Sequence, residues 1–251
     1  MIRQMNEKDI PILRVMSGND LFLSRILSNY NAYGNTDLAQ FWVQVEKDTL
    51  NAVFCRVDNV LTLAHLSDGN MDEMAGFLYA VDANEMLCSP EFAEKIHPAS
   101  AVSGPILYLL LREHKSCDFE FNCNPPLREI YEVMQQCKSP TFRVPEWEPF
   151  YLDMSHRIRH QCAVSVGIRD SKGKLCACGF SVSQTEHNAI LGGICVVPKQ
   201  RRKGYGTKVV QALLSQLPQS DIYVFRDQKE NVEFYDSLGF TDHGTWAELA
   251  I

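Results

Sequence analysis

Two glycines within a run of cationic residues follow an apolar stretch late in the sequence. Residues 190–197 are rich in β-branched side chains and predict a strand. After the run, apolar residues recur on one helix face: Val209, Val210, Leu213, Leu214 and Leu217. A helix N-terminus after a cationic turn binds anions, because backbone N–H groups and the helix dipole favour negative charge there. Gly204 and Gly206 let the backbone approach closely, so the spacing predicts a pyrophosphate site.

The loop Arg201-Arg202-Lys203-Gly204-Tyr205-Gly206 matches neither a Walker A loop nor the three-glycine dinucleotide fingerprint. It resembles motif A of the GCN5-related N-acetyltransferases (the GNAT family), which reads Arg/Gln-x-x-Gly-x-Gly/Ala after a Val-x-Pro strand end. A second segment, residues 231–240, resembles the last helix of that family, which commonly ends Phe/Leu-Tyr-x-x-x-Gly-Phe. The alternative is a surface helix whose basic residues are simply solvated.

Composition limits the classes of protein. Of the 251 residues, 45% are hydrophobic and 22% charged, which is typical of a soluble globular protein of one or two domains. The formal net charge of −7 argues against a nucleic-acid binder and is compatible with a cationic amine acceptor. Neither a membrane span nor a signal peptide is indicated. The nine cysteines show neither a disulfide framework nor the spacing of a zinc site, so we expect a cytoplasmic protein without a metal. The sequence does not determine the oligomeric state.

The C-terminal half predicts an α+β domain. The expected order is helix, helix, three strands, helix, strand, helix and strand, which matches the GNAT fold, where the fourth and fifth strands splay apart around the cofactor. The expected elements are helices at 126–137 and 148–159, strands at 162–168, 175–183 and 188–197, a helix ending near 217, a strand at 222–225, a helix at 228–238 and a final strand.

The N-terminal half resembles a second, degenerate copy of this fold. Asp9 is the expected N-cap of a first helix, and strands are expected at 2–5, 41–45, 51–57 and 60–66, followed by a helix at 71–81 and an apolar run at 106–111. Acidic residues in the segment 67–73 stand where the other copy has its cationic loop, and they would repel a pyrophosphate. We therefore predict a degenerate domain at 1–115 that does not bind coenzyme A, a boundary near 112–117, and an acetyltransferase domain at 116–251.

The resemblance implies transfer of an acetyl group from acetyl-CoA to an amine by direct attack in a ternary complex. The side chains of Arg201 and Lys203 and the N–H groups of the loop would hold the pyrophosphate, and the strand end would pair with the pantetheine arm. The N–H of Val196 would polarise the acetyl carbonyl. The implied cofactor-binding residues are Cys195, Val196, Val197, Arg201, Arg202, Lys203, Gly204, Tyr205, Gly206, Thr207 and Asn231.

Tyr235 corresponds to the tyrosine that many family members use as the general acid for the departing thiolate, and the alternative is a tyrosine that packs a helix. Asn231 either bonds the cofactor arm or caps its helix, since the family more often has Asn three residues earlier, where this chain has Gln228. No carboxylate lies on the strand at 189–194, so the general base is not identified. Glu186 and His187 could act through water, but an exposed hairpin is the favoured interpretation of both, and an amine can also lose its proton to solvent.

Two further features leave alternatives open. Arg157 or Arg159 could clamp an acceptor carboxylate, or the cations could simply stabilise a helix C-terminus. The missing strand carboxylate also permits a non-catalytic acyl-CoA-binding sensor or scaffold. Tandem GNAT-like proteins that use aminoacyl-tRNA or long acyl chains are other possibilities, although an acidic chain disfavours a tRNA donor.

Overall fold

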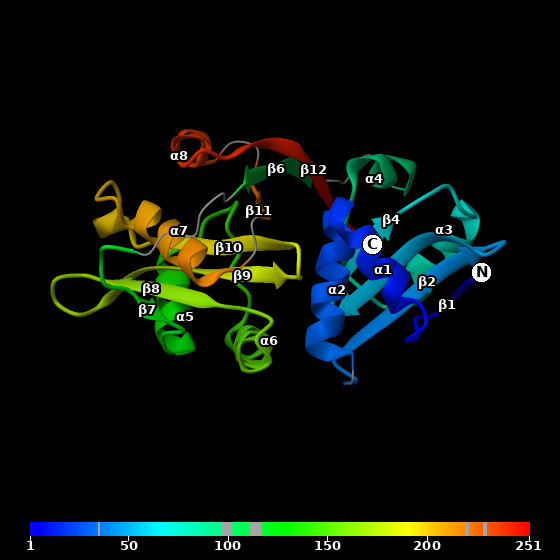
Figure 1. Ribbon diagram of the computed structural model, residues 1–251, viewed down its shortest axis with the longest axis horizontal. Helices are drawn as coiled ribbons and strands as arrows, with labels where there is room; N and C mark the ends of the chain where they lie inside the picture. The colour runs from blue at the N-terminus through cyan, green and yellow to red at the C-terminus, as the bar shows by residue number, and fades with distance from the viewer. Residues whose placement is uncertain (35, 97–101, 111–116, 219–220, 228–229) are drawn as a thin grey trace. The chain divides into compact units, whose positions relative to one another are not determined.

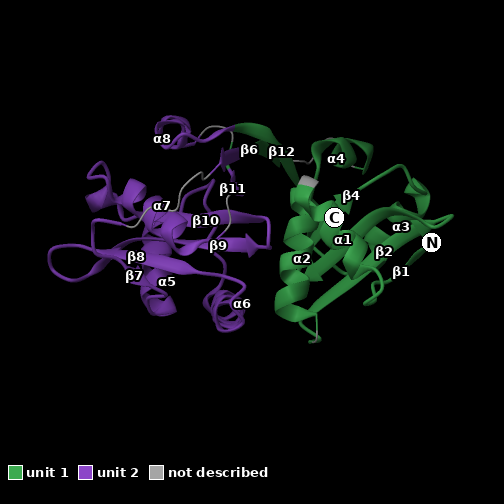
Figure 2. Ribbon diagram, in the orientation of Figure 1, with its two compact units in different colours: residues 1–106, 226–228, 242–251 green, residues 107–225, 229–241 purple. Residues whose placement is uncertain are grey.

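The computed structural model is an α+β protein, as the sequence predicts, and it divides into two compact units (Figures 1 and 2). It describes residues 1–34, 36–96, 102–110, 117–218, 221–227 and 230–251. Unit 1 comprises residues 1–106, 226–228 and 242–251, and unit 2 comprises residues 107–225 and 229–241. The predicted boundary near 112–117 falls mostly on residues 111–116, which lie outside the described residues.

Unit 1 contains a mixed sheet in the order β1-β2-β3-β4-β5-β12, in which only β4 and β5 pair in parallel. The predicted strands and the helix at 71–81 are all present. The second helix of this unit, Leu21–Tyr33, was not predicted as a separate element. The elements are β1 (Ile2–Gln4), α1 (Ile10–Met16), η1 (Ser17–Asn19), α2 (Leu21–Tyr33), β2 (Ala39–Glu46), β3 (Thr49–Val57), β4 (Val60–His65), α3 (Met71–Ala80), β5 (Glu85–Cys88), α4 (Pro90–Ile96) and β12 (Thr241–Ala250).

The last strand of the chain completes unit 1. β12 pairs antiparallel with β5, with Ala247 opposite Cys88 and Leu249 opposite Met86. Ala247 and Leu249 are buried in the same core as Phe54 of β3. The sequence prediction grouped residues 242–251 with the C-terminal domain, whereas their contacts group them with unit 1.

Unit 2 has the element order expected for the C-terminal half, with a sheet in the order β6-β11-β10-β9-β8-β7. Only the final helix is notably shorter than predicted. The elements are β6 (Val102–Leu110, in unit 2 from Leu107), β7 (Asn122–Cys123), α5 (Leu127–Cys137), α6 (Trp147–Arg159), β8 (Ser165–Arg169), β9 (Leu175–Gln184), β10 (Asn188–Val196), η2 (Pro198–Gln200), α7 (Tyr205–Gln216), β11 (Asp221–Phe225) and α8 (Val232–Ser237).

Helices cover both faces of the unit 2 sheet. Successive residues of a strand point to opposite faces, and β9 shows this directly. Ala177 packs in a cluster with Val209 and Leu213 of α7, while its neighbour Cys178 packs with Ile130 of α5. The apolar face predicted for α7 is therefore the face that anchors this helix, and with it the cationic loop, to the sheet.

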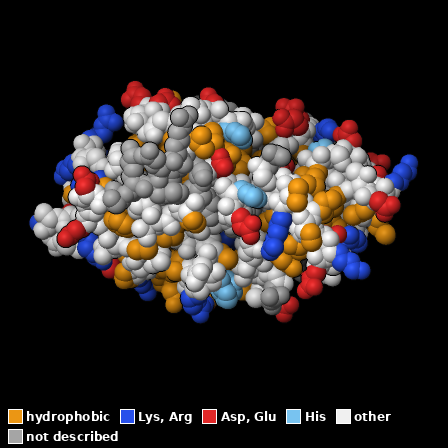
Figure 3. Space-filling view, viewed as in Figure 1, with side chains coloured by type: hydrophobic (Ala, Val, Ile, Leu, Met, Phe, Trp, Pro, Cys, Tyr) orange, Lys and Arg blue, Asp and Glu red, His pale blue; other side chains and the backbone are white. Residues whose placement is uncertain are grey.

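The outer surface gives little direction about partners. Acidic and basic side chains are interspersed on the face shown in Figure 3. Among the helices that the structure describes, none is both long and apolar enough to cross a membrane.

Asp9 is the N-cap residue of α1, as predicted, but its side chain does not make the expected capping hydrogen bond. Its carboxylate instead accepts hydrogen bonds from Arg3 Nη1 and Nη2 at 2.8 and 2.7 Å, and from the N–H of Asn6 at 2.9 Å. A neighbouring guanidinium thus displaced the local interaction that the sequence position suggested.

This ion pair gives a pH-dependent contribution to stability. The hydrogen bonds from Arg3 hold the pKa of Asp9 below its ordinary value of 3.8. A depressed native pKa stabilises the fold above the unfolded pKa and loses that effect as pH falls through the native value. We expect Asp9→Asn to lower the free energy of unfolding by less than about 1 kcal/mol at neutral pH. The difference, measured by urea unfolding, should narrow below pH 3.8; a difference that is constant with pH would contradict this origin.

Candidate functional site

The cationic loop adopts a left-handed turn just before α7. Arg202 has a φ of 63° and Gly204 a φ of 80°. A Cβ on Gly204 would meet nothing within 4 Å, so the space in front of this residue is open. The glycine predicted to allow close approach of an anion is therefore at a position that requires its backbone freedom.

A row of backbone donors faces this turn. The first intrahelical bond at the start of α7 runs from the N–H of Lys208 to the carbonyl of Gly204, at 3.1 Å. The N–H groups of residues 202–207 have no hydrogen-bond acceptor within the described part of the chain, and no side chain caps the helix. Unpaired N–H groups at a helix N-terminus carry partial positive charge, so this turn is suited to bind a phosphate.

In unit 1, side chains of the protein accept two of the N–H groups at the start of α3. Asn70 caps α3 by accepting the N–H of Glu73 at 3.0 Å. The N–H of Asn70 itself donates to the Glu46 carboxylate at 2.9 Å. Donors that are occupied by acidic and amide side chains are less available to a phosphate; that this unit does not bind coenzyme A stays a prediction.

Next to the loop, the C-terminal half of β10 has one edge that is not paired with β11. β10 pairs with β11 from Asn188 to Leu191 and with β9 as far as Val196. The N–H of Val197 donates to the carbonyl of Cys176 at 2.9 Å, so it is not available to a ligand. Because hydrogen-bonded pairs alternate along an antiparallel ladder, the N–H and carbonyl of Val196 point away from β9, toward the side that β11 has left.

Two side chains donate hydrogen bonds to the carbonyl oxygen of Val196. Arg201 Nε donates to it at 3.1 Å and Cys137 Sγ at 3.3 Å. Arg201 is predicted to contact a pyrophosphate, which stays a prediction. Its Nε here donates to the carbonyl at the end of β10. Lys203 Nζ donates to Gln200 Oε1 at 2.8 Å. The N–H of Val196 is therefore the polar main-chain group of this residue that remains for a substrate.

Cys195 lies inside the protein, with 4% of its surface exposed. A hydrogen bond from Cys137 lowers the pKa of Cys195, but the hydrogen bond with Cys178 and burial outweigh it, so that the pKa is raised overall. The thiol therefore stays protonated and packs against the sheet. All nine cysteines of the chain are free thiols.

Helix α8 lies directly against the start of α7. A Cβ added to Gly206 would come within 3.1 Å of the Phe234 ring, so this glycine lets the two helices approach. Tyr235 is 8% exposed, and its ring makes edge contacts with Phe234 and Phe240 at centroid distances of 5.0 and 5.5 Å. Asn231 is exposed with a φ of 59°, and its side chain does not cap α8. Gln228 lies outside the described residues.

The other polar candidates lie elsewhere. Glu186 and His187 are exposed on the turn that precedes β10. The length of that strand separates them from Val196 by roughly 26 Å. Arg157 is buried and donates to Asp153 at 2.7 Å, and Arg159 Nε donates to the carbonyl of Ser155 at 3.1 Å. These contacts favour the structural interpretation of the cationic cluster on α6.

Some residues near the site gave no signal in the sequence. Cys137 reaches Val196 across 59 positions of the chain, and the Thr141 hydroxyl donates to Glu230 across 89 positions. The second contact joins the segment between α5 and α6 to the segment before α8. Within the described residues, no group of three or more His, Cys, Asp or Glu side chains is arranged to hold a metal ion.

Comparison with known proteins agrees with this geometry. The sequence model of the acetyltransferase (GNAT) family matches residues 127–240. No curated protein matches the chain.

Several solved structures share the fold over the whole chain at low sequence identity. A Drosophila protein has a TM-score of 0.69 at 14% identity, over 100% of this chain and 98% of its own. A GCN5-related N-acetyltransferase from Sphaerobacter thermophilus has a TM-score of 0.62 at 10% identity, over 100% and 95%. A tandem GNAT protein from the clavulanic acid biosynthesis pathway has a TM-score of 0.61 at 11% identity, over 100% and 98%. Residues 127–240 therefore form a domain of the acetyltransferase (GNAT) family.

Proposed function

We propose that this chain is an acetyl-CoA-dependent N-acetyltransferase that moves an acetyl group to an amine acceptor by direct attack in a ternary complex. The observation that carries the proposal is the row of unpaired N–H groups at residues 202–207, next to the open edge of β10. A diphosphate suits the row of donors, and an extended amide-containing arm suits a strand edge. The acceptor is a small molecule or a peptide with a free amine.

Each proposed role follows from the geometry described above. The N–H groups from Arg202 to Thr207 bind the pyrophosphate of acetyl-CoA, with Lys203 adding positive charge. The N–H of Val196 donates to the acetyl carbonyl oxygen as negative charge develops there, an interaction worth roughly 2.7–4 kcal/mol in enzymes where it has been measured. Arg201 and Cys137 act indirectly, because they hold the peptide group of Val196 in place.

Tyr235 is proposed as the general acid that protonates the departing thiolate. Tyr235→Phe removes only the hydroxyl, so we expect kcat to fall by about 10²–10⁴ while the KM for acetyl-CoA changes little. Tyr205→Phe is the matched control, since it removes a hydroxyl from the loop itself. Steady-state release of free CoA measures both variants. Equal turnover by wild type and Tyr235→Phe would leave Tyr235 with a packing role alone.

The second candidate function is a non-catalytic acyl-CoA-binding sensor or scaffold. The observation in its favour is that β10 carries no carboxylate, while Glu186 and His187 lie just before its N-terminal end, far from Val196. A cationic amine can still lose its proton to solvent. Release of free CoA from acetyl-CoA with a panel of primary amines separates the two functions, because a sensor binds acetyl-CoA without consuming it.

Cofactor choice is tested by thermal unfolding with acetyl-CoA, CoA, NAD or ATP. A ligand at 100 times its dissociation constant adds about 2.7 kcal/mol of stability, which is enough to move the unfolding midpoint by several degrees. We expect a shift with the two CoA species and none with NAD or ATP. A chain that responds to no CoA species would not be an acetyltransferase.

A cytoplasmic location is part of the proposal. It is supported by nine free cysteines, several of them buried, because thiols remain reduced in that compartment.

A further inference from the structure

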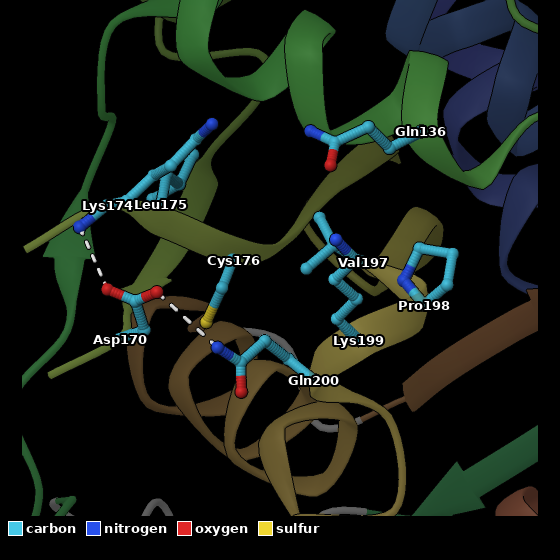
Figure 4. Close-up of a pocket in the computed structure, with 9 residues that line it drawn as sticks. All are labelled: Gln136, Asp170, Lys174, Leu175, Cys176, Val197, Pro198, Lys199 and Gln200. Atoms are coloured by element: carbon cyan, nitrogen blue, oxygen red, sulfur yellow. Dashed lines mark hydrogen bonds between the residues drawn. The ribbon is translucent and has the colours of Figure 1, made fainter. Parts of the chain in front are cut away.

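A pocket of about 400 Å³ lies next to Val197, the residue that follows β10 (Figure 4). Its walls come from the end of α5, the turn between β8 and β9, the start of β9, and the η2 segment. Leu175 and Cys176 of β9 line it, whereas Val196, whose N–H is proposed to contact the acetyl group, does not. Its volume is within the range of small-molecule sites, about 300–1,000 Å³.

Charges of both signs line this one pocket. Asp170 Oδ1 accepts the N–H groups of Lys172 and Lys174 at 2.9 and 3.1 Å. These backbone hydrogen bonds hold the pKa of Asp170 below its ordinary value, so the carboxylate is ionised at neutral pH. Lys174 and Lys199 also line the pocket, and neither forms an ion pair among the described residues.

These groups select a class of ligand. Asp170 would repel a simple anion, and the two lysines would repel a simple cation. A molecule that carries an ammonium and a carboxylate satisfies both. Leu175, Val197 and Pro198 provide an apolar surface, and no aromatic side chain among the described lining residues is present to stack on a flat ring.

We propose that this pocket binds an α-amino acid with an aliphatic side chain. The ammonium of the ligand pairs with Asp170, its carboxylate with Lys174 and Lys199, and its side chain packs on Val197 and Pro198. Neither Val196 nor residues 201–207 line this pocket, so the bound amino acid is an effector and not the acceptor.

One side chain links the pocket to the phosphate-binding loop. Gln200 Nε2 donates to Asp170 Oδ2 at 3.4 Å, and Gln200 Oε1 accepts Lys203 Nζ at 2.8 Å (Figure 4 shows the first of these). A ligand ammonium on Asp170 Oδ2 competes with Gln200 and so changes the position of Lys203. This step, which rests on the proposed function, makes the affinity for CoA depend on the amino acid.

Calorimetric titration of the full chain with L-leucine, L-isoleucine, L-valine and L-methionine tests the site. We expect at least one to bind, and its affinity to fall about tenfold or more in Asp170→Asn and in Lys199→Met, consistent with loss of a charged hydrogen bond. Asn can still accept the N–H groups of the turn, so the first variant keeps the local fold. Lys172→Met is the matched control, because Lys172 lies on the same turn but its side chain does not line the pocket. The proposal is overturned if none of the four binds, or if Asp170→Asn binds as wild type does.

The decarboxylated and deaminated counterparts of the best ligand, for L-leucine 3-methylbutylamine and 4-methylpentanoate, should each bind more weakly than the amino acid. Equal binding of either one would overturn the assignment to a zwitterion. For the link to the loop, we expect the Kd for CoA to change about fivefold when the amino acid is present, and to be unaffected in Gln200→Leu. Amino-acid binding without any CoA binding would sustain the pocket and refute the acetyltransferase; CoA binding without amino-acid binding would do the reverse.

Discussion

The Gly204→Glu variant is expected to lose affinity for CoA and acetyl-CoA by a factor of about 100 or more. The new carboxylate would lie among the N–H donors of residues 202–207, where it repels the diphosphate and competes for its donors. Two unit charges 4 Å apart near a protein surface interact by about 4 kcal/mol, and each 1.4 kcal/mol is a factor of ten in affinity. Titration calorimetry with CoA measures the loss directly.

The substitution should leave the fold largely intact. A Cβ at Gly204 meets no atom within 4 Å, so the main penalty is its left-handed backbone, about 1–2 kcal/mol. Gly173→Glu is the matched control, because Gly173 has a φ of 76°, equally open surroundings and no part in the loop. We expect Gly173→Glu to show the same loss of stability and normal CoA binding. If both variants bind CoA as wild type does, the donors at residues 202–207 are not the phosphate site.

Local sequence patterns were sufficient for the loop and its helix. Val209, Val210 and Leu213 recur at helical spacing because they pack on one face of the sheet, and the structure places them in one core cluster. Gly204 was identified by residue type, and its φ of 80° shows why another residue is disfavoured there. The predicted GNAT fold is confirmed at residues 127–240, where short-range periodicity, turn residues and loop chemistry all indicate the same elements.

Contacts between distant segments were not predictable in this way. The helix expected from residue 228 begins at Val232, because Asn231 adopts a φ of 59° that an α-helix cannot include, and Asn is common both inside and outside helices. The Val196 carbonyl takes donors from Arg201 and Cys137, which no spacing rule connects. Asp9 stands at the N-cap position of α1, yet its carboxylate pairs with the guanidinium of Arg3 and not with a helical N–H group.

The last strand illustrates the same limit. Alternation along residues 241–250 identifies a strand but does not say which sheet it joins, because strand partners are set by tertiary packing and register. Contacts put its apolar residues in the core of unit 1, although they follow unit 2 in the sequence. This assignment has a consequence for stability that the sequence order would not suggest.

Leu249→Ala, at the third residue from the end of the sequence given, is expected to destabilise unit 1 by about 2–5 kcal/mol. Leu249 is 1% exposed and packs with Phe54, Leu63 and Met86, so truncation leaves a cavity in that core. Amide hydrogen exchange should become faster in β3, β4 and β5, while β9 and β10 of unit 2 keep their protection.

Thr245→Ala is the matched control on the same strand, since its side chain is exposed and its loss should change stability by less than about 0.5 kcal/mol. Faster exchange confined to β9 and β10 in Leu249→Ala would show that the strand stabilises unit 2 instead. A fragment that ends at residue 106 lacks β12, so it should be less stable than unit 1 in the full chain, and addition of a peptide of residues 242–251 should restore protection to β5. Rescue by the peptide distinguishes a missing strand from general damage to the fragment, because the amides of β5 that point away from β4 are protected only by a strand paired along that other edge.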